Sequence, residues 1–267
     1  GAGDPFTIQI TENITSSATD VTAYMMATNQ DLDTLMQVVN ANNEVVFECD
    51  DAGTSLCEEN TSDLSSSTVS RTLGRETPPR NLNSMITLPT AGAELDFTGG
   101  FYINFLMTSF QQSSTGDYLV AFHVGIDDGT GVTAQQTDPD PTPPSDVPGG
   151  TVAGGGINVD CPNGQQITNG VEIVVNMRPG FTYTATVVGV NGFDPILAVV
   201  NRGEVFDCND DSSDAATYEV NLPSTGRVGT SRFNSQLPFS HNFDGFENIS
   251  LVVGGFSGSV GEFVLIL

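Results

Sequence analysis

The chain contains no lysine and no tryptophan, and its seven basic residues are all arginines. Against them stand 33 acidic residues, so the formal net charge is −26 at pH 7. A surface this negative repels phosphate backbones and anionic lipid headgroups, so we expect neither nucleic acid nor membrane insertion among its interactions. A high net charge also keeps an exposed protein in solution, which is the simplest reason for this composition.

Long apolar runs are also missing. No stretch approaches the ~18 consecutive apolar residues that a membrane-spanning helix needs. No signal peptide is visible, and the chain starts abruptly at GAGDPF, as a processed mature end would.

Cysteine is scarce, because the chain has only four, which allow three different pairings. None forms a C-x-x-C pair and no histidine lies near them in the sequence, which argues against zinc. Each lies among acidic or turn residues rather than in an apolar run. We predict two disulfides, Cys49–Cys57 and Cys161–Cys208, and therefore an oxidising location that is extracellular or at the cell surface.

Residues that commonly carry out catalysis are few. The two histidines, His123 and His241, do not occupy equivalent positions in the repeat described below, and we expect both to be structural or solvated. The segment GFSGS (255–259) departs from the nucleophile motif G-x-S-x-G at its last position. No glycine-rich phosphate loop leads into a helix. We therefore expect that the protein is not an enzyme.

What the chain does contain is a repeat. LDTLMQVVN (32–40) is nearly repeated as FDPILAVVN (193–201), and four further blocks match in the same order. These blocks are TAYMMATN (22–29) with TATVVGVN (184–191), EVVFECDD (44–51) with EVFDCNDD (204–211), FTGGFYI (97–103) with FDGFENI (243–249), and SFQQSSTGDYLVAF (109–122) with GFSGSVGEFVLI (255–266). We align the second pair with Cys49 opposite Cys208. Matches in constant order indicate an internal duplication.

The repeated blocks have the pattern of β-strands. Each alternates or runs apolar over four to eight residues between Gly, Asn, Asp or Pro, and none has a convincing helical spacing. We predict an all-β fold of two tandem antiparallel β-sandwich domains, immunoglobulin-like or jelly-roll-like, with seven or eight strands each. The domains span 1–130 and 157–267, and a Pro/Gly-rich linker covers 131–156. We expect each half to bury its own core and to leave no cleft for catalysis.

The second half contains RPGFTYT (178–184), then FDPILAVVN and GEVFDCNDD, then LPSTG (222–226) and the closing ISLVVGGFSGSVGEFVLIL (249–267). This order resembles bacterial pre-peptidase C-terminal domains, in which a D-P-x-L strand precedes an acidic turn and a G-x-Y strand closes the sandwich. The first half keeps LDTLMQVVN, CDD and TGDYLVAF, although an insertion at 58–96 departs from the pattern. The resemblance implies an extracellular, non-catalytic β-sandwich that accompanies other secreted parts, usually a hydrolase.

The acidic turn of the second half has the spacing of a calcium loop, in which alternating oxygen ligands surround one ion. The candidate ligands are Asp207, Asn209, Asp211 and Asp214. The turn departs from the motif at its sixth and twelfth positions, which are Ser212 and Tyr218, and the first half keeps Glu48 and Asp50 but has Ala52 as third residue. The alternative is an acidic hairpin turn whose side chains cap their own backbone. Calcium is therefore a candidate ligand, and no cofactor is required.

Candidate glycosylation sites are of two kinds. Three N-x-[ST] sequons are present, at Asn13, Asn60 and Asn248. The proline-rich linker has the composition of O-glycosylated stalks and offers Thr137, Thr142 and Ser145. With secretion indicated by the disulfides, covalent glycans are a further expectation.

The amino-terminal segment GAGDPFTIQITEN alternates apolar residues at Phe6, Ile8 and Ile10. This strand either pairs within its own domain or adds to an edge of the second sandwich of another subunit, as in the strand exchange of pilus subunits. A head-to-tail contact of this kind that does not close produces a filament. Our leading hypothesis is a secreted structural subunit of a filament or surface layer. The alternative is a carbohydrate- or protein-binding accessory region of a secreted hydrolase.

Overall fold

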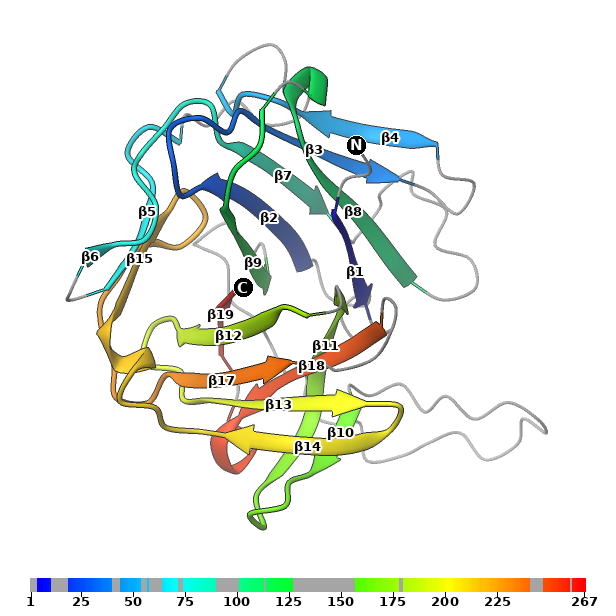
Figure 1. Cartoon of the computed structure of the whole chain (residues 1–267). Helices are drawn as coiled ribbons and strands as arrows, with labels where there is room; N and C mark the ends of the chain where they lie inside the picture. The colour runs from blue at the N-terminus through cyan, green and yellow to red at the C-terminus, as the bar shows by residue number, and fades with distance from the viewer. Residues whose placement is uncertain are drawn as a thin grey trace.

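Figure 1 shows the computed structural model of the chain, which describes residues 4–10, 19–39, 44–53, 57, 64–71, 74–89, 101–112, 114–126, 157–177, 180–240, 247–259 and 261–267. Their regular structure is antiparallel β-strand apart from three short 3-10 turns, so the predicted all-β class is confirmed. The turns are η1 (Phe110–Gln112), η2 (Ala215–Thr217) and η3 (Phe256–Gly258). Within the described residues, no helix has the length and apolar character that crossing a membrane requires. The predicted linker at 131–156 lies outside these residues.

The largest sheet has nine strands, drawn from both halves of the chain. Eight of them lie side by side in the order β14 (Glu204–Asn209), β13 (Pro195–Asn201), β18 (Glu247–Gly255), β11 (Gln166–Met177), β1 (Asp4–Ile10), β8 (Phe101–Ser109), β3 (Thr34–Val39) and β4 (Val45–Cys49). The ninth, β10 (Ile157–Asp160), pairs with the first part of β11.

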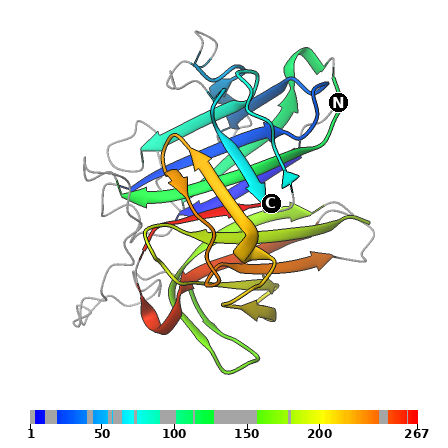
Figure 2. The same cartoon turned by 90° about the vertical axis from the view of Figure 1, so that its left-hand side faces the viewer.

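Two smaller sheets complete the molecule, and each again draws strands from both halves. The six-stranded sheet has the order β17 (Ser235–Ser240), β12 (Thr182–Gly189), β19 (Phe263–Ile266), β9 (Tyr118–Ile126), β2 (Thr19–Ala27) and β7 (Ser84–Pro89). The four-stranded sheet has the order β16 (Gly226–Val228), β15 (Tyr218–Leu222), β5 (Thr68–Arg71) and β6 (Gly74–Arg75). In Figure 2 the four-stranded sheet faces the viewer, with β5 in cyan beside β15 in yellow-orange.

Each sheet passes from one half of the chain to the other at a single strand pair. On either side of that pair the strands follow one another in corresponding order, so that β11, β18, β13 and β14 run outward as β1, β8, β3 and β4 do. The crossing pairs are β1 with β11, β9 with β19, and β5 with β15. The residues paired there include Thr7 opposite Val174, Ala121 opposite Ile266, and Val69 opposite Val220.

The segment that the sequence analysis treats as an insertion, 58–96, holds ordinary members of this arrangement. It contains β5, β6 and β7, which take the places in the sheet order that β15, β16 and β17 take on the other side. Not all of this segment is therefore an insertion, because strands in matching places of the sheet order occur in both halves.

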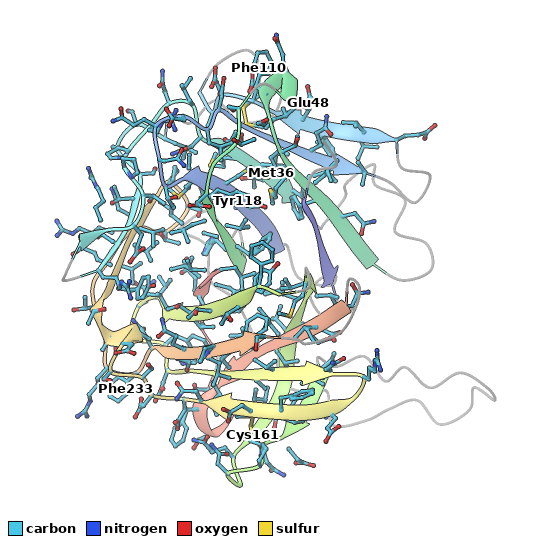
Figure 3. All side chains as sticks on the ribbon, in the orientation of Figure 1. Met36, Glu48, Phe110, Tyr118, Cys161 and Phe233 are labelled. Carbon is cyan, nitrogen blue, oxygen red and sulfur yellow. A yellow bond between two sulfur atoms is a disulfide. The ribbon has the colours of Figure 1, made fainter. Side chains whose placement is uncertain are left out.

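The main core lies between the nine-stranded and six-stranded sheets, and it is shared. One cluster of buried apolar side chains includes Tyr24 and Met36 from the first half and Val175 and Leu251 from the second. Met36 is fully buried and lies between the sheets in Figure 3. The expectation that each half buries its own core is thus wrong, because both layers continue across the boundary and leave no separate interiors.

A second, smaller cluster of described residues covers the outer face of the large sheet in the second half. Ile167 of β11 and Cys161 pack there against Ala198 of β13 and Cys208 of β14. This explains a difference between the repeated strands. Gln37 in β3 is part-exposed and bonds Glu48, whereas β13 is buried on both faces and reads as a continuous apolar run.

Both predicted disulfides are present, Cys49–Cys57 and Cys161–Cys208. The alignment of Cys49 with Cys208 is wrong by one residue, however. Met36 of β3 faces Cys49, whereas Leu197, the residue of β13 that corresponds to Met36, faces Asn209. Since neighbouring residues of a strand point to opposite faces, Cys49 enters the main core and Cys208 enters the outer cluster.

A buried polar pair also joins the halves. The His123 Nε2 atom of β9 lies 2.6 Å from Oε1 of Glu262, and both side chains are almost fully buried. The backbone of Glu262 is held separately, because its carbonyl accepts a hydrogen bond from Val190 N. The pair therefore links β9 to the segment that leads into β19, beside one of the three crossing strand pairs.

Replacing Glu262 with alanine should lower the free energy of unfolding by about 3 kcal/mol, because His123 would remain buried without its partner. Chemical denaturation in urea measures the change. Glu262→Gln, which keeps a polar group at the position, should lose clearly less. A loss below about 1 kcal/mol for the alanine variant would contradict a structural role for the pair.

The two disulfides should contribute unequally. Their cysteines are 47 and 8 positions apart, so chain entropy predicts a loss of about 4 kcal/mol without Cys161–Cys208 and about 2.5 kcal/mol without Cys49–Cys57. Thermal denaturation of the two double-serine variants compares them directly. The opposite order would show that the short bridge acts mainly on the native turn beside it.

Candidate functional site

Three carboxylates converge at one end of the first half. Asp33 immediately precedes β3, and Asp50 and Asp51 immediately follow β4, so a neighbouring strand pair delivers all three to the same end of the sheet. One carboxylate oxygen from each lies within 4.8 Å of the others. Asp50 is buried, with 5% of its surface exposed, and the other two are part-exposed. Among the described residues this is the group whose geometry could hold a metal ion.

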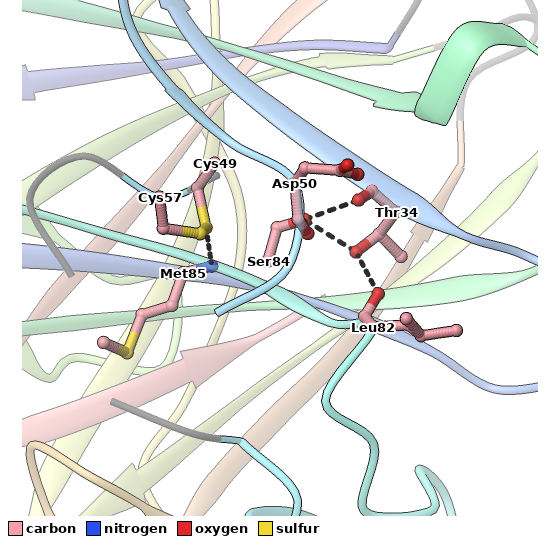
Figure 4. Close-up of a disulfide and its surroundings, with 7 residues drawn as sticks. All are labelled: Thr34, Cys49, Asp50, Cys57, Leu82, Ser84 and Met85. Atoms are coloured by element: carbon pink, nitrogen blue, oxygen red, sulfur yellow. Dashed lines mark hydrogen bonds between the residues drawn. A yellow bond between two sulfur atoms is a disulfide. The ribbon is translucent and has the colours of Figure 1, made fainter. Parts of the chain in front are cut away.

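The backbone that carries these carboxylates is held by a hub of hydroxyl groups (Figure 4). The Ser84 hydroxyl, at the start of β7, contacts the carbonyl oxygens of Thr34 at 2.8 Å and Asp50 at 2.9 Å. It also lies 2.7 Å from the Thr34 hydroxyl, which donates to Leu82 O. The Cys49–Cys57 disulfide holds the end of β4 next to Asp50. The acidic turn is therefore fixed to both β3 and β7.

Burial and mutual repulsion dominate the electrostatics. Burial, followed by the charges of Asp51, Asp33 and Glu48, raises the pKa of Asp50 to about 7. Burial also raises the pKa of Asp51, the Asp33 charge raises it further, and the Arg80 guanidinium lowers it. Arg80 is itself anchored, because its Nη1 donates to a carbonyl oxygen 2.8 Å away on Leu32. The group is thus an electronegative site that one arginine offsets only in part.

The second half has the same arrangement of a serine and three aspartates, but its carboxylates do not converge. Ser235 bonds the carbonyl oxygens of Pro195 and Asp210, as Ser84 does in the first half. The corresponding aspartates, Asp194, Asp210 and Asp211, are all present. Burial and the charges of its two neighbours raise the pKa of Asp194. Gln165, however, donates a hydrogen bond to the Asp210 carboxylate, and the three do not form a chelating group.

The calcium ligands predicted from the sequence are not brought together in this way. Asp207, Asp211 and Asp214 are exposed and form no chelating group among the described residues. The side-chain oxygen of Asn209 already accepts a hydrogen bond from Gln236 N at 3.1 Å. In the first half, Glu48 bonds Gln37 while Asp50 joins the three-carboxylate group. The sequence analysis missed Asp33, although this residue lies in the repeated block LDTLMQVVN (32–40).

The other candidate residues are placed only in part. Asn248 is exposed on β18, whereas Asn13 and Asn60 lie outside the described residues, as do Thr137, Thr142 and Ser145. Phe6, Ile8 and Ile10 belong to β1, whose backbone pairs with β8 on one edge and β11 on the other. Their side chains lie outside the described part of the structure.

Features typical of an active site are few in the described residues. His123 is buried and bonded to Glu262, and His241 lies outside the description. A cavity of about 380 Å³ lies between the turn at 189–193 and the segment 225–231, and Arg227 is the ionisable residue in its lining.

Comparison with known proteins adds no family to this picture. No protein-family model matches the chain, and no curated protein matches it either. The geometry of the chain's own residues is therefore the basis for the functional proposals below.

Without divalent cations, replacing Asp50 with asparagine should stabilise the protein near pH 8. Because the folded-state pKa of Asp50 is raised to about 7, its contribution to stability is complete below about pH 4 and is lost as the pH rises through 7. Asparagine stays neutral throughout. Melting curves in chelator should place the variant at least about 2 °C above the wild type at pH 8, with the gap closing toward pH 4. A variant that melts lower at pH 8 would contradict the repulsion.

Proposed function

We propose that the chain is a non-catalytic, secreted structural subunit that assembles head to tail into an extracellular filament or surface layer. The observation that carries the proposal is the position of β1. This strand, at the start of the chain, fills a slot in the nine-stranded sheet between β8 of the first half and β11 of the second. In the assembled form, β1 of one subunit fills the same slot in the next subunit.

Several features of β1 make it suited to exchange. It consists of seven residues, and eight more, 11–18, separate it from β2. Eight extended residues reach at most about 27 Å, which lets the strand leave its own slot without unfolding β2. A strand inserted from another subunit makes the same backbone hydrogen bonds, so the exchange changes little in energy except chain entropy. Because donor and slot are different surfaces, repeated exchange gives an open chain rather than a closed dimer.

An origin by internal duplication supports this proposal. We infer that the two halves are tandem sandwich domains from one ancestral domain, because each contributes corresponding strands in corresponding order to all three sheets. The register of the β1–β11 pair is also consistent with a duplication. Phe6 faces Val175 and Ile8 faces Ile173 around the central pair of Thr7 and Val174, as expected for two related strands meeting across a two-fold axis. On this interpretation, β1 lies where two copies of one fold meet.

The composition fits an extracellular building element. Two disulfides suit an oxidising compartment, and the net charge of −26 keeps a crowded surface hydrated. Glycans at Asn248, which is exposed, and at the other sequons would add to this coat. A non-catalytic role is supported by the burial of His123 and by a cavity that brings no acid–base pair into its described lining.

Mixing two single-cysteine variants tests exchange between subunits. Thr7 and Val174 are direct partners across β1 and β11, at a separation that a disulfide can bridge. If Thr7→Cys and Val174→Cys chains are co-assembled and oxidised, a crosslink between them forms only when β1 of one chain enters the slot of the other. Non-reducing electrophoresis should therefore show covalent pairs that reducing agent separates.

Val205→Cys provides the matched control, because β14 lies at the far edge of the same sheet from β1. Mixed with Thr7→Cys, it should give no crosslink. Removal of residues 1–10 should abolish polymer formation seen by electron microscopy. If the Thr7→Cys and Val174→Cys mixture stays uncrosslinked while filaments form, assembly uses another surface. Strong, specific binding on a glycan array would instead favour the alternative, an accessory binding region of a secreted hydrolase.

A further inference from the structure

We propose that Asp33, Asp50 and Asp51 bind one calcium ion, which locks the acidic turn of the first half to the start of β3. Their nearest carboxylate oxygens all lie within 4.8 Å of one another. Two oxygens on one calcium ion, each about 2.3–2.6 Å from the metal, are at most about 5 Å apart. The three carboxylates therefore already occupy positions from which they can share one ion without moving the backbone.

A buried oxygen without a partner provides the second observation. Asp50 has 5% of its surface exposed, and its Oδ1 atom is enclosed but forms no hydrogen bond among the described residues. The same holds for Oδ1 of Asp33. Leaving a buried carboxylate oxygen unsatisfied is unfavourable, and native structures rarely do so without an ion or a water molecule. Both residues belong to the three-carboxylate cluster, so a cation bound between the carboxylates would compensate these buried groups.

The frame around the site is rigid enough to hold such an ion. The Asp33 carbonyl accepts a hydrogen bond from Phe110 N at 3.0 Å, and Asp33 N donates to Ser114 at 3.1 Å. In the segment that carries Asp50 and Asp51, Ala52 N donates to the carbonyl oxygen of Asn83 at 3.0 Å. Both ligand segments are thus fixed through their backbones, which leaves the side-chain oxygens for the ion. Pre-organisation of this kind reduces the entropy lost on binding.

Charge and coordination favour calcium over magnesium. The charge of Arg80 acts on Asp51, so the site retains about two uncompensated negative charges when all three carboxylates are ionised, which match a divalent cation. Calcium accepts irregular sets of six to eight oxygens, including backbone carbonyls and water. Magnesium requires near-octahedral geometry and keeps several waters, for which a buried carboxylate such as Asp50 leaves little room.

The second half serves as an internal comparison. It keeps aspartates at the three corresponding positions, but Gln165 donates a hydrogen bond to the Asp210 carboxylate. Asp210 is also only part-buried, unlike Asp50. In the second half, the Cys161–Cys208 disulfide connects the segment containing Gln165 to β14. The disulfide of the first half, Cys49–Cys57, connects different segments. The Gln165 side-chain amide therefore already bonds the Asp210 carboxylate, whereas the corresponding carboxylate of the first half, Asp50, remains available to an ion. We expect calcium in the first half and not at these three residues of the second.

Calorimetric titration of the chelator-treated full chain with CaCl₂ tests the site directly. We expect about one ion per chain with a dissociation constant of about 10⁻⁴–10⁻³ M, as in other extracellular calcium modules. Melting curves should shift upward by about 3–10 °C at 10 mM CaCl₂. Asp50→Asn should remove both the binding heat and the shift, and its melting curve in chelator will show that the variant is folded.

Asp210→Asn is the matched control, because it changes the corresponding residue in the second half. It should retain the full response to calcium. The assignment is overturned if the wild type shows neither heat nor a shift, if both variants lose the response equally, or if Asp50→Asn keeps it. A response to MgCl₂ as large as that to CaCl₂ would overturn the choice of metal.

Discussion

The structure depends on strand pairing between its two halves. Backbone amides and carbonyls at the middle of a sheet must find partners, because water cannot reach them once the layers close. β1 pairs with β8 of its own half on one edge and with β11 of the second half on the other, so without β1 both of these strands would have an unpaired edge. The β9–β19 and β5–β15 pairs close the other two sheets in the same way. Without these crossings the shared core would open, and both strand edges of each crossing pair would be exposed to neighbouring molecules.

The same constraint underlies the proposed assembly. A strand that completes a sheet can be replaced by the equivalent strand of another subunit, since the hydrogen bonds do not depend on which chain supplies it. The halves are also joined by side chains, including the buried contact of His123 with Glu262 and the 2.6 Å contact between the hydroxyls of Tyr24 and Ser224. These contacts join the halves at places other than the β1–β11 pair.

The acidic turns show how two similar frameworks differ in detail. In both halves a serine at the start of a strand fixes the turn, and three aspartates surround it. One half moves its disulfide to the outer face and supplies a glutamine to one carboxylate. The other keeps its disulfide in the main core and leaves the carboxylates facing one another. In the proposed calcium site, this repulsion between the carboxylates would be the driving force for binding the cation.

The sequence alone determined the β-strand character, the repeated blocks and both disulfide pairings, because period-two alternation, turn residues and cysteine spacing are local properties of the chain. It also located the acidic turn, but not which carboxylates meet there. Asp33 lies 17 positions before Asp50 (50 − 33), and only the β3–β4 pairing brings the two together. The one-residue shift between Cys49 and Cys208 was decided by strand register, which assigns neighbouring residues to opposite faces. Whether the halves have separate cores or one depends on pairing at strand edges. Edge pairing uses backbone groups that every residue carries, so only the tertiary structure decided it.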